Sequence, residues 1–212
     1  ALTEVGIDLK EARFVSDDNQ AIVDAIRALS KSYDHVFSSG GIGPTHDDIT
    51  ADAIAKAFHK RIDVRKDALK ILREHYDRQG VELNEARLRM ARIPDGAKLI
   101  DNPVSSAPGF RLKNVNVMAG VPSIFQAMLQ SVLPSLVGGM PVQSETVRIN
   151  RGEGDIAADL GVLAQTYPDV TMGSYPFLKD DVHGTNLVLR SSDKDRLAAA
   201  KADLIKRLQH DA

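Results

Sequence analysis

The sequence of 212 residues contains neither cysteine nor tryptophan. Without cysteine the chain can form no disulfide framework, no thiolate metal site and no cysteine nucleophile, so its chemistry must come from other side chains or the backbone. It also lacks an excess of one charge, because 27 Lys and Arg face 29 Asp and Glu, a net of −2. A basic footprint of the kind that nucleic-acid and membrane-surface binders carry is therefore missing. We expect a small-molecule ligand, with neither nucleic acid nor membrane as a partner.

Long hydrophobic runs are absent as well, and the first residues do not resemble a signal peptide. We therefore expect a cytoplasmic protein, and we expect it to form a homo-oligomer. With 43% hydrophobic residues the chain can bury a core. At ~100–200 residues per domain, the length allows a main domain with a small second one.

The first six residues read as the last turn of a helix that Gly6 closes, which predicts either a preceding segment or a frayed terminus.

Strands alternate with helices up to about residue 137. The alternation predicts an α/β fold with three α/β/α layers and a mostly parallel sheet. The expected strands are 7–15, 35–39, 97–100 and 115–119. The expected helices begin at a cap on Asp17 or Asp18, after Gly43, at Lys66, at a cap on Asn84 and at a cap on Ser123.

The order of elements changes after Gly138 and Gly139. Beyond them the pattern is strand, helix, strand, strand, helix, which predicts a small C-terminal α+β domain. The strands are expected at 146–149, 170–172 and 186–190. We therefore predict one domain over residues 1–137 and a second over residues 142–212.

The most informative stretch is a glycine-rich loop between a predicted buried strand and a helix. Its glycines let the backbone turn tightly and approach a ligand closely, and the next helix offers free N–H groups and the positive end of its dipole. Threonine hydroxyls add groups that suit phosphate or metal-bound water, although Thr50 could equally cap the helix. The predicted phosphate-binding residues of this loop are Gly40, Gly41, Gly43, Thr45 and Thr50.

Two adjacent carboxylates, Asp47 and Asp48, stand at the same helix entrance. They would repel a phosphate unless positive charge lies between them. A divalent cation such as Mg²⁺, bridging these acids to phosphate oxygens, would resolve the conflict. The alternative is that both acids merely cap the helix and complement its dipole. His46, between Thr45 and the acids, could contact phosphate or metal, but a lone loop histidine is more often solvated.

Two further loops also follow predicted strands. One carries Asn102, Ser105, Ser106 and Gly109, and the other carries Gly120 and Ser123. In an open α/β sheet, ligands bind outside the carboxyl ends of the strands, so the three loops could meet at one crevice. Taken alone, the first of these loops reads more simply as an ordered surface turn.

A cluster of arginines, Arg87, Arg89 and Arg92, lies between the second and third predicted strand–loop units. It could steer anionic ligands toward the crevice, but the pattern favours an exposed helix face.

The three loops together resemble a known family. The stretches 40–50, 102–110 and 119–123 are similar in order and spacing to the MoaB/Mog molybdopterin-binding domain. They look closest to the branch found in the competence-damage-inducible protein CinA and beside the FAD synthase domain of some eukaryotic enzymes. The resemblance covers about residues 1–137, and the stretch 173–176 is similar to the small domain that follows in that branch.

This resemblance implies a three-layer fold with its site at the glycine loop. Members that act in cofactor synthesis bind or adenylylate molybdopterin, whereas the CinA-like branch is associated with metal-dependent hydrolysis of nucleotide diphosphates such as ADP-ribose or FAD. Carried over, Asp47 and Asp48 would be the catalytic acids and the ligands of Mg²⁺, Mn²⁺ or Co²⁺. The glycines would form the phosphate loop and residues 102–109 the second wall.

Two features depart from the family pattern. Nothing in the chain matches the family's opening strand and acidic Gly-Asp-Glu turn, and Ile124 stands where many CinA-like members carry Glu. Three hypotheses therefore stay open: a metal-dependent nucleotide pyrophosphatase, a protein that binds molybdopterin or transfers an adenylyl group to it, and a ligand-binding module without catalysis.

Overall fold

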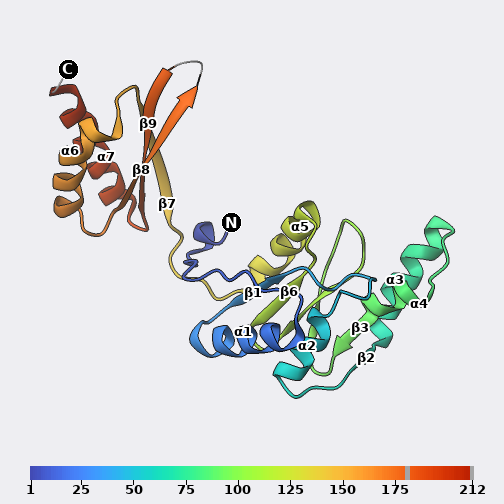
Figure 1. Ribbon diagram of the computed structural model, residues 1–212. Coiled ribbons are helices and arrows are strands. Elements are labelled where there is room, and N and C mark those ends of the chain that lie inside the picture. The colour runs from blue at the N-terminus through green and yellow to red at the C-terminus, as the bar shows by residue number, and fades with distance from the viewer. Residues whose placement is uncertain (180–181, 211–212) are drawn as a thin grey trace. The chain divides into compact units, whose positions relative to one another are not determined.

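The computed structural model describes residues 1–179 and 182–210 (Figure 1). Its internal contacts divide the chain into two compact units. The larger unit is Glu11–Leu136, and the smaller unit joins Ala1–Lys10 to Val137–Ala212.

The larger unit is built on a four-stranded sheet with the order β1-β6-β5-β4. These strands are β1 (Val36–Ser39), β4 (Lys98–Ile100), β5 (Gly109–Leu112) and β6 (Val115–Met118). β1 pairs with β6 in parallel, and β5 runs antiparallel to both β6 and β4. Helices α1 (Asn19–Ser32) and α2 (Thr50–Ala57) cover one face, and α5 (Pro122–Val132) covers the other (Figure 1). The unit therefore has three layers.

Alternation of side chains along the strands produces two separate cores. On the α1 and α2 face, Val115 and Val117 pack with Phe110 and with Ile54 of α2 in one cluster. On the opposite face, Met118 of β6 packs with Met128 of α5 in a second, smaller cluster. Each of these side chains is at most 1% exposed, so the sheet is covered on both sides.

The remaining elements of the larger unit extend one end of it. A two-stranded antiparallel pair, β2 (Ile62–Val64) with β3 (Arg92–Pro94), carries short helical segments at its side. These segments are α3 (Lys66–Gln79), α4 (Glu85–Leu88) and the 3-10 helix η2 (Arg89–Ala91), and a further 3-10 helix, η3 (Leu133–Ser135), follows α5.

Helix ends follow the capping residues that the sequence supplies. Asp18 caps α1 by accepting a hydrogen bond from the Ala21 backbone N–H at 2.7 Å. Asn84 caps α4 in the same way through the Arg87 N–H at 3.0 Å. Gly80 ends α3 in the left-handed conformation that glycine adopts readily. The predicted caps on Asp18 and Asn84 are confirmed.

The smaller unit has the predicted order β7 (Gln143–Ile149), α6 (Glu153–Thr166), β8 (Thr171–Lys179), β9 (Val182–Ser191) and α7 (Lys194–His210). Its antiparallel sheet has the order β7-β9-β8. Ile156 and Leu163 of α6 and Leu204 of α7 bury the side chains of Leu187 and Leu189 from β9. A 3-10 turn, η1 (Thr3–Val5), belongs to this unit and ends at Gly6, as predicted. The α/β class with a small C-terminal α+β domain is therefore confirmed.

The sheet of the larger unit is mixed, because β1, β4 and β6 run in one direction and β5 runs antiparallel to both of its neighbours. The sequence prediction missed β5, which lies directly after Pro108 in a stretch interpreted as a loop. A two-residue connection, with Lys113 at a φ of 54°, turns β5 back onto β6 as a hairpin. This hairpin places one antiparallel strand between the parallel strands β6 and β4.

The strand expected at 7–15 is also wrong. These residues form no strand, and the Phe14 side chain is fully exposed. In the described part of the larger unit β1 is an edge strand, and a groove of about 560 Å³ separates it from residues 13–17. An alternating apolar pattern becomes a strand only where another strand supplies hydrogen-bond partners. Residues 7–15 have no such neighbour among the described strands.

No helix within the described residues has both the length and the apolar character that a membrane crossing requires.

An ion pair in the smaller unit makes a testable prediction. Arg196 donates two hydrogen bonds to Asp169, at 2.7 and 2.8 Å, and these lower the pKa of the Asp169 carboxyl from 3.8 to about 2. A lowered pKa means that the pair stabilises the fold above pH ~4 and that this stabilisation disappears as pH falls toward 2.

We expect Arg196→Gln to return the pKa of Asp169 to near its ordinary value, as measured by NMR titration of the carboxyl carbon. The thermal stability of this variant should fall below that of the wild type at pH 6 and converge with it near pH 2. An Asp169 carboxyl that titrates near 4 in the wild type would contradict the assignment.

Candidate functional site

Three strands of the larger sheet end at the same edge. Because β5 is antiparallel to both of its neighbours, β4 and β6 run in one direction, and β1 runs parallel to β6. The carboxyl ends of β1, β4 and β6 therefore lie together, which is where open α/β sheets bind ligands. The glycine loop follows β1, the loop 101–108 follows β4, and the loop 119–121 follows β6.

The glycine loop lies directly against the loop after β6. The Gly40 backbone N–H donates to the Met118 carbonyl oxygen at 2.9 Å. A methyl group placed on Gly120 would lie only 3.1 Å from the Cα atom of Gly40. Two loops that are 80 residues apart in sequence thus touch backbone to backbone, and a side chain at Gly120 would crowd this approach.

Thr50 closes the glycine loop onto the start of α2. Its backbone N–H donates to the Gly41 carbonyl oxygen at 2.9 Å, and its side chain is 6% exposed. Gly41 adopts a φ of +70°, and a side chain there would collide with the Thr50 hydroxyl, 2.0 Å away. The Thr50 side chain therefore packs under the loop and fixes its shape.

Asp48 turns back into the loop. Its Oδ2 atom accepts hydrogen bonds from the Thr45 backbone N–H at 2.8 Å and from the Thr45 hydroxyl at 2.6 Å. The carboxylate lies over Gly43, where an added methyl group would meet it at 2.6 Å. Thr45 thus holds Asp48 at a defined position above the loop backbone.

Asp47 points outward instead, with a side chain that is 65% exposed. Hydrogen bonding to the Thr45 hydroxyl, and then to its own backbone N–H, lowers the pKa of Asp47 below its ordinary value. The hydroxyl has one proton, so it serves one of the two carboxylates at a time. Because its pKa is lowered, Asp47 is ionised at neutral pH. His46 is fully exposed and solvated, with Nδ1 3.9 Å from the Asp47 carboxylate.

Neither acid caps α2. The residue at the N-cap position is Ile49, which supplies no side-chain hydrogen bond. The part of the alternative in which Asp47 and Asp48 cap α2 is therefore wrong. The acid in the first helical turn is Asp52, and Arg92 pairs with it through two hydrogen bonds.

The loop after β4 is organised by Asn102, which is 3% exposed. Its amide nitrogen donates to the Ser105 hydroxyl at 2.7 Å and to the Ala107 carbonyl at 2.8 Å. Its amide oxygen accepts from two backbone N–H groups, those of Val104 and Ser105. The Asn102 side chain therefore shapes the loop from inside, and Ser106, with a φ of 60°, stands at its sharpest turn. A ligand would meet the outer surface of this loop.

Two other predicted site residues have clear structural places. Gly109 is buried at the start of β5, where an added methyl group would lie 2.3 Å from the Val117 carbonyl oxygen. Ser123 was expected to cap α5, and this is wrong, because Pro122 begins the helix and Val121 is the N-cap. Proline fits the first helical position, since its fixed φ suits the helix and an N–H group at that position would have no partner within the helix.

Sequence reasoning missed Arg89 as a site residue. Its guanidinium Nη2 donates to the backbone carbonyl of Asp48 at 3.3 Å, so it lies against the glycine loop. A narrow cavity joins Arg89 to Gly43, Asp48 and Pro108 of the loops. The signal was present in the cluster of arginines, but sequence spacing alone did not show which of them contacts the glycine loop.

A metal at this site would depend on Asp47 and Asp48. Across the part of the chain that the structure describes, no three His, Asp or Glu side chains gather as a ready-made metal site. Mg²⁺ is commonly held by one or two carboxylates together with substrate phosphates. The exposed Asp47 carboxylate and the fixed Asp48 carboxylate fit that pattern.

Comparisons with known proteins agree with this arrangement. The family model described as "probable molybdopterin binding domain" matches residues 1–137, and the model described as "FAD synthase, middle domain" matches residues 141–212. A protein of Archaeoglobus fulgidus is 34% identical over 176 residues, which cover 82% of this chain and 74% of that protein. The chain belongs to the MoaB/Mog molybdopterin-binding family, in its CinA-like branch.

Other members of the CinA-like family extend the comparison. A "CinA-like protein" of Geobacter metallireducens is 32% identical over 197 residues, which cover 87% of this chain and 48% of that protein. The crystal structure of CinA from Thermoplasma acidophilum superposes with a TM-score of 0.58 at 35% identity, covering 63% of this chain and 81% of that one. These comparisons therefore show the family and its fold in this chain.

The shape of the glycine loop yields a matched pair of variants. Gly41 and Gly96 both have positive φ, but only at Gly41 would a methyl group collide with a neighbour, Thr50. We expect Gly96→Ala to lower the free energy of unfolding by about 1–2 kcal/mol from backbone strain alone. Gly41→Ala should cost clearly more, because the collision adds to the same strain. Urea denaturation measures both, and equal losses would contradict the packing of Thr50 under the loop.

Proposed function

We propose that this CinA-like protein is a metal-dependent nucleotide pyrophosphatase that hydrolyses ADP-ribose or FAD-like diphosphates. The observation that carries the proposal is the pair of carboxylates, Asp47 and Asp48, on a glycine loop at the carboxyl edge of the sheet. Thr45 fixes Asp48, and Asp47 is ionised and exposed. The match to a FAD synthase middle domain over residues 141–212 supports a nucleotide ligand.

Hydrolysis adds water across the pyrophosphate. The water oxygen forms a bond to one phosphorus atom, the bond from that phosphorus to the bridging oxygen breaks, and a proton is released. ADP-ribose would give AMP and ribose 5-phosphate, and FAD would give AMP and FMN. When bound, Mg²⁺, Mn²⁺ or Co²⁺ would neutralise the diphosphate and activate the water.

Side chains and backbone groups of the loops would bind the phosphate and the cation. The Gly41 backbone N–H and the N–H groups of the first turn of α2 beyond Thr50 would receive the phosphate oxygens, because the N–H groups of Gly40 and Thr50 are already bonded within the protein. Asp47 and Asp48 would hold the cation, and the two hydrogen bonds from Thr45 would keep Asp48 from swinging away from it. The second wall would be the loop 102–108, stiffened by the internal bonds of Asn102.

Substitution of Asp48 tests this proposal. We expect the wild type to release AMP from ADP-ribose or FAD in the presence of Mg²⁺, Mn²⁺ or Co²⁺. Asp48→Asn keeps the shape of the side chain but removes its charge, and it should reduce kcat by about a hundredfold or more. Asp95→Asn, at an exposed acid in a turn after β3, serves as the matched control and should retain full activity. An Asp48→Asn variant as active as the control would rule out the proposed role.

The description of the matched family as molybdopterin-binding favours a second function. In this alternative the glycine loop binds a pterin phosphate, or transfers an adenylyl group to it. Isothermal calorimetry should then detect binding of molybdopterin or its adenylate. The protein should release no AMP from ADP-ribose with any of the three metals. Failure of the protein to retain either pterin compound would exclude the alternative.

A further inference from the structure

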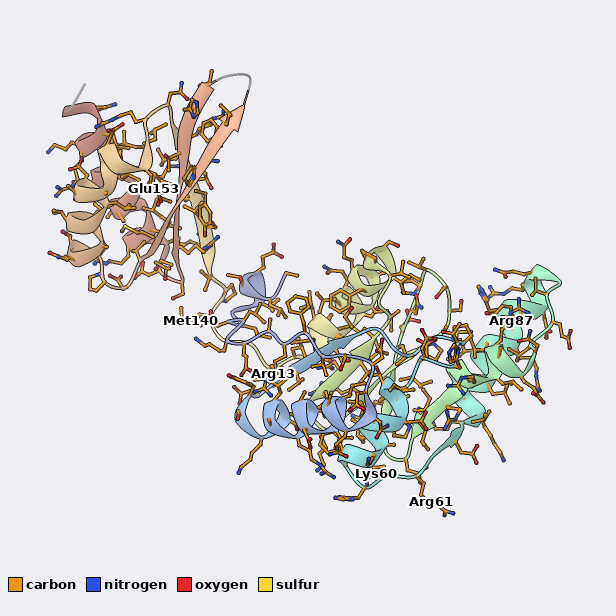
Figure 2. The ribbon with its side chains drawn as sticks, in the orientation of Figure 1. Arg13, Lys60, Arg61, Arg87, Met140 and Glu153 are labelled. Carbon is orange, nitrogen blue, oxygen red and sulfur yellow. The ribbon has the colours of Figure 1, made fainter. Side chains whose placement is uncertain are left out.

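The three arginines of the segment 87–92 have three different environments, although the sequence suggested one exposed face. Arg87 lies with its guanidinium 5.1 Å from the centre of the Tyr76 ring and donates to the Glu82 carbonyl oxygen. Figure 2 shows Arg87 in this position, on α4 beside α3. Arg87 therefore serves the packing of short helices.

Arg92 lines the same cavity as Arg89, but it is already paired there. It donates two hydrogen bonds to the two carboxylate oxygens of Asp52, at 2.9 and 2.5 Å. This two-pronged pair neutralises both charges and ties β3 to the first turn of α2. Arg92 therefore has little capacity left for a ligand.

Arg89 differs from both. It contacts the Asp48 backbone carbonyl through Nη2, and its Nε atom is buried with no hydrogen-bond partner among the described residues. A buried guanidinium nitrogen without an acceptor is costly, so it calls for an acceptor that the protein itself does not provide. The cavity that Arg89 lines with Gly43 and Asp48 also contains the Asp52–Arg92 pair in its wall, and its volume of about 10 Å³ suits a single water-sized atom.

A phosphate oxygen has the chemistry that this position lacks. It is a charged acceptor of the right size, and the planar fork of an arginine binds phosphate through two nitrogens at once. The two acids of the glycine loop would repel a phosphate, and Arg89 places a fixed positive charge against the Asp48 backbone.

We propose that Arg89 binds a phosphate group of the substrate, with one phosphate oxygen entering the cavity beside Gly43 and Asp48. The inference rests on the proposed function in one respect, that the ligand of the glycine loop carries phosphate. Arg89 is then the recognition residue that offsets the acids of the loop, and a divalent cation adds to this charge when it is bound.

The experiment compares wild type, Arg89→Ala, Arg89→Lys and the matched control Arg87→Ala. Calorimetry in the presence of a chelator gives the Kd for ADP-ribose and for inorganic pyrophosphate, and assays with metal give kcat and KM. We expect Arg89→Ala to raise Kd and KM about 10- to 100-fold with a much smaller change in kcat. Arg89→Lys should be intermediate, because it keeps the charge and loses the fork. Arg87→Ala should behave as wild type.

Thermal unfolding without ligand checks that each variant is folded. If Arg89→Ala does not fold, Arg89→Lys decides the matter, and an unchanged Kd for pyrophosphate in that variant overturns the inference. A folded Arg89→Ala with wild-type Kd and KM also overturns it, because the cavity then holds only structural water. Arg89-dependent binding of pyrophosphate without any AMP release would uphold the inference while refuting the proposed hydrolysis. A wild type that binds neither compound would overturn both.

Discussion

The parallel pairing of β1 with β6 is the constraint on which the candidate site depends. It aligns Ser39 with Met118, so the glycine loop and the loop after β6 leave the sheet side by side. Asn116 reinforces the pairing from within β6, because its buried amide donates to the Val36 carbonyl at 3.2 Å. The apolar side chains of Val115 and Val117 hold the pair between the helix layers. This pairing therefore brings Gly40 and Gly120 into contact.

The electrostatics of the site depend on which of its charged side chains are already paired within the protein. Asp52, the acid in the first turn of α2, is neutralised by Arg92, which leaves the positive end of the helix dipole without a capping acid. Asp48 lies over Gly43 of the glycine loop, and Asp47 is exposed beside it. Arg89 lies against the same loop with an unused buried nitrogen. The site therefore combines opposite charges that a bound cation and a phosphate would together balance.

Local features of the fold could be predicted from sequence because their causes are local. Asp18, Gly80 and Asn84 act on backbone atoms within a few residues, so their roles are readable from composition and spacing. Features that need a distant partner could not be predicted in this way. The pattern over 7–15 resembles a strand but finds no neighbouring strand, whereas β5 becomes a strand because the turn at Lys113 pairs it with β6.

The same division holds for the site. The absence of cysteine by itself excluded thiolate chemistry, and the glycines beside two adjacent acids predicted oxygen ligands on a phosphate-type loop. Only the tertiary structure decided that Thr45 holds Asp48 and that the Asn102 side chain is used within its own loop. It also decided that, of the three arginines, Arg89 has a buried guanidinium nitrogen with no partner among the described residues beside the glycine loop. The physical reason is that residue type fixes what a group can bind, whereas packing fixes which partners it has already bound.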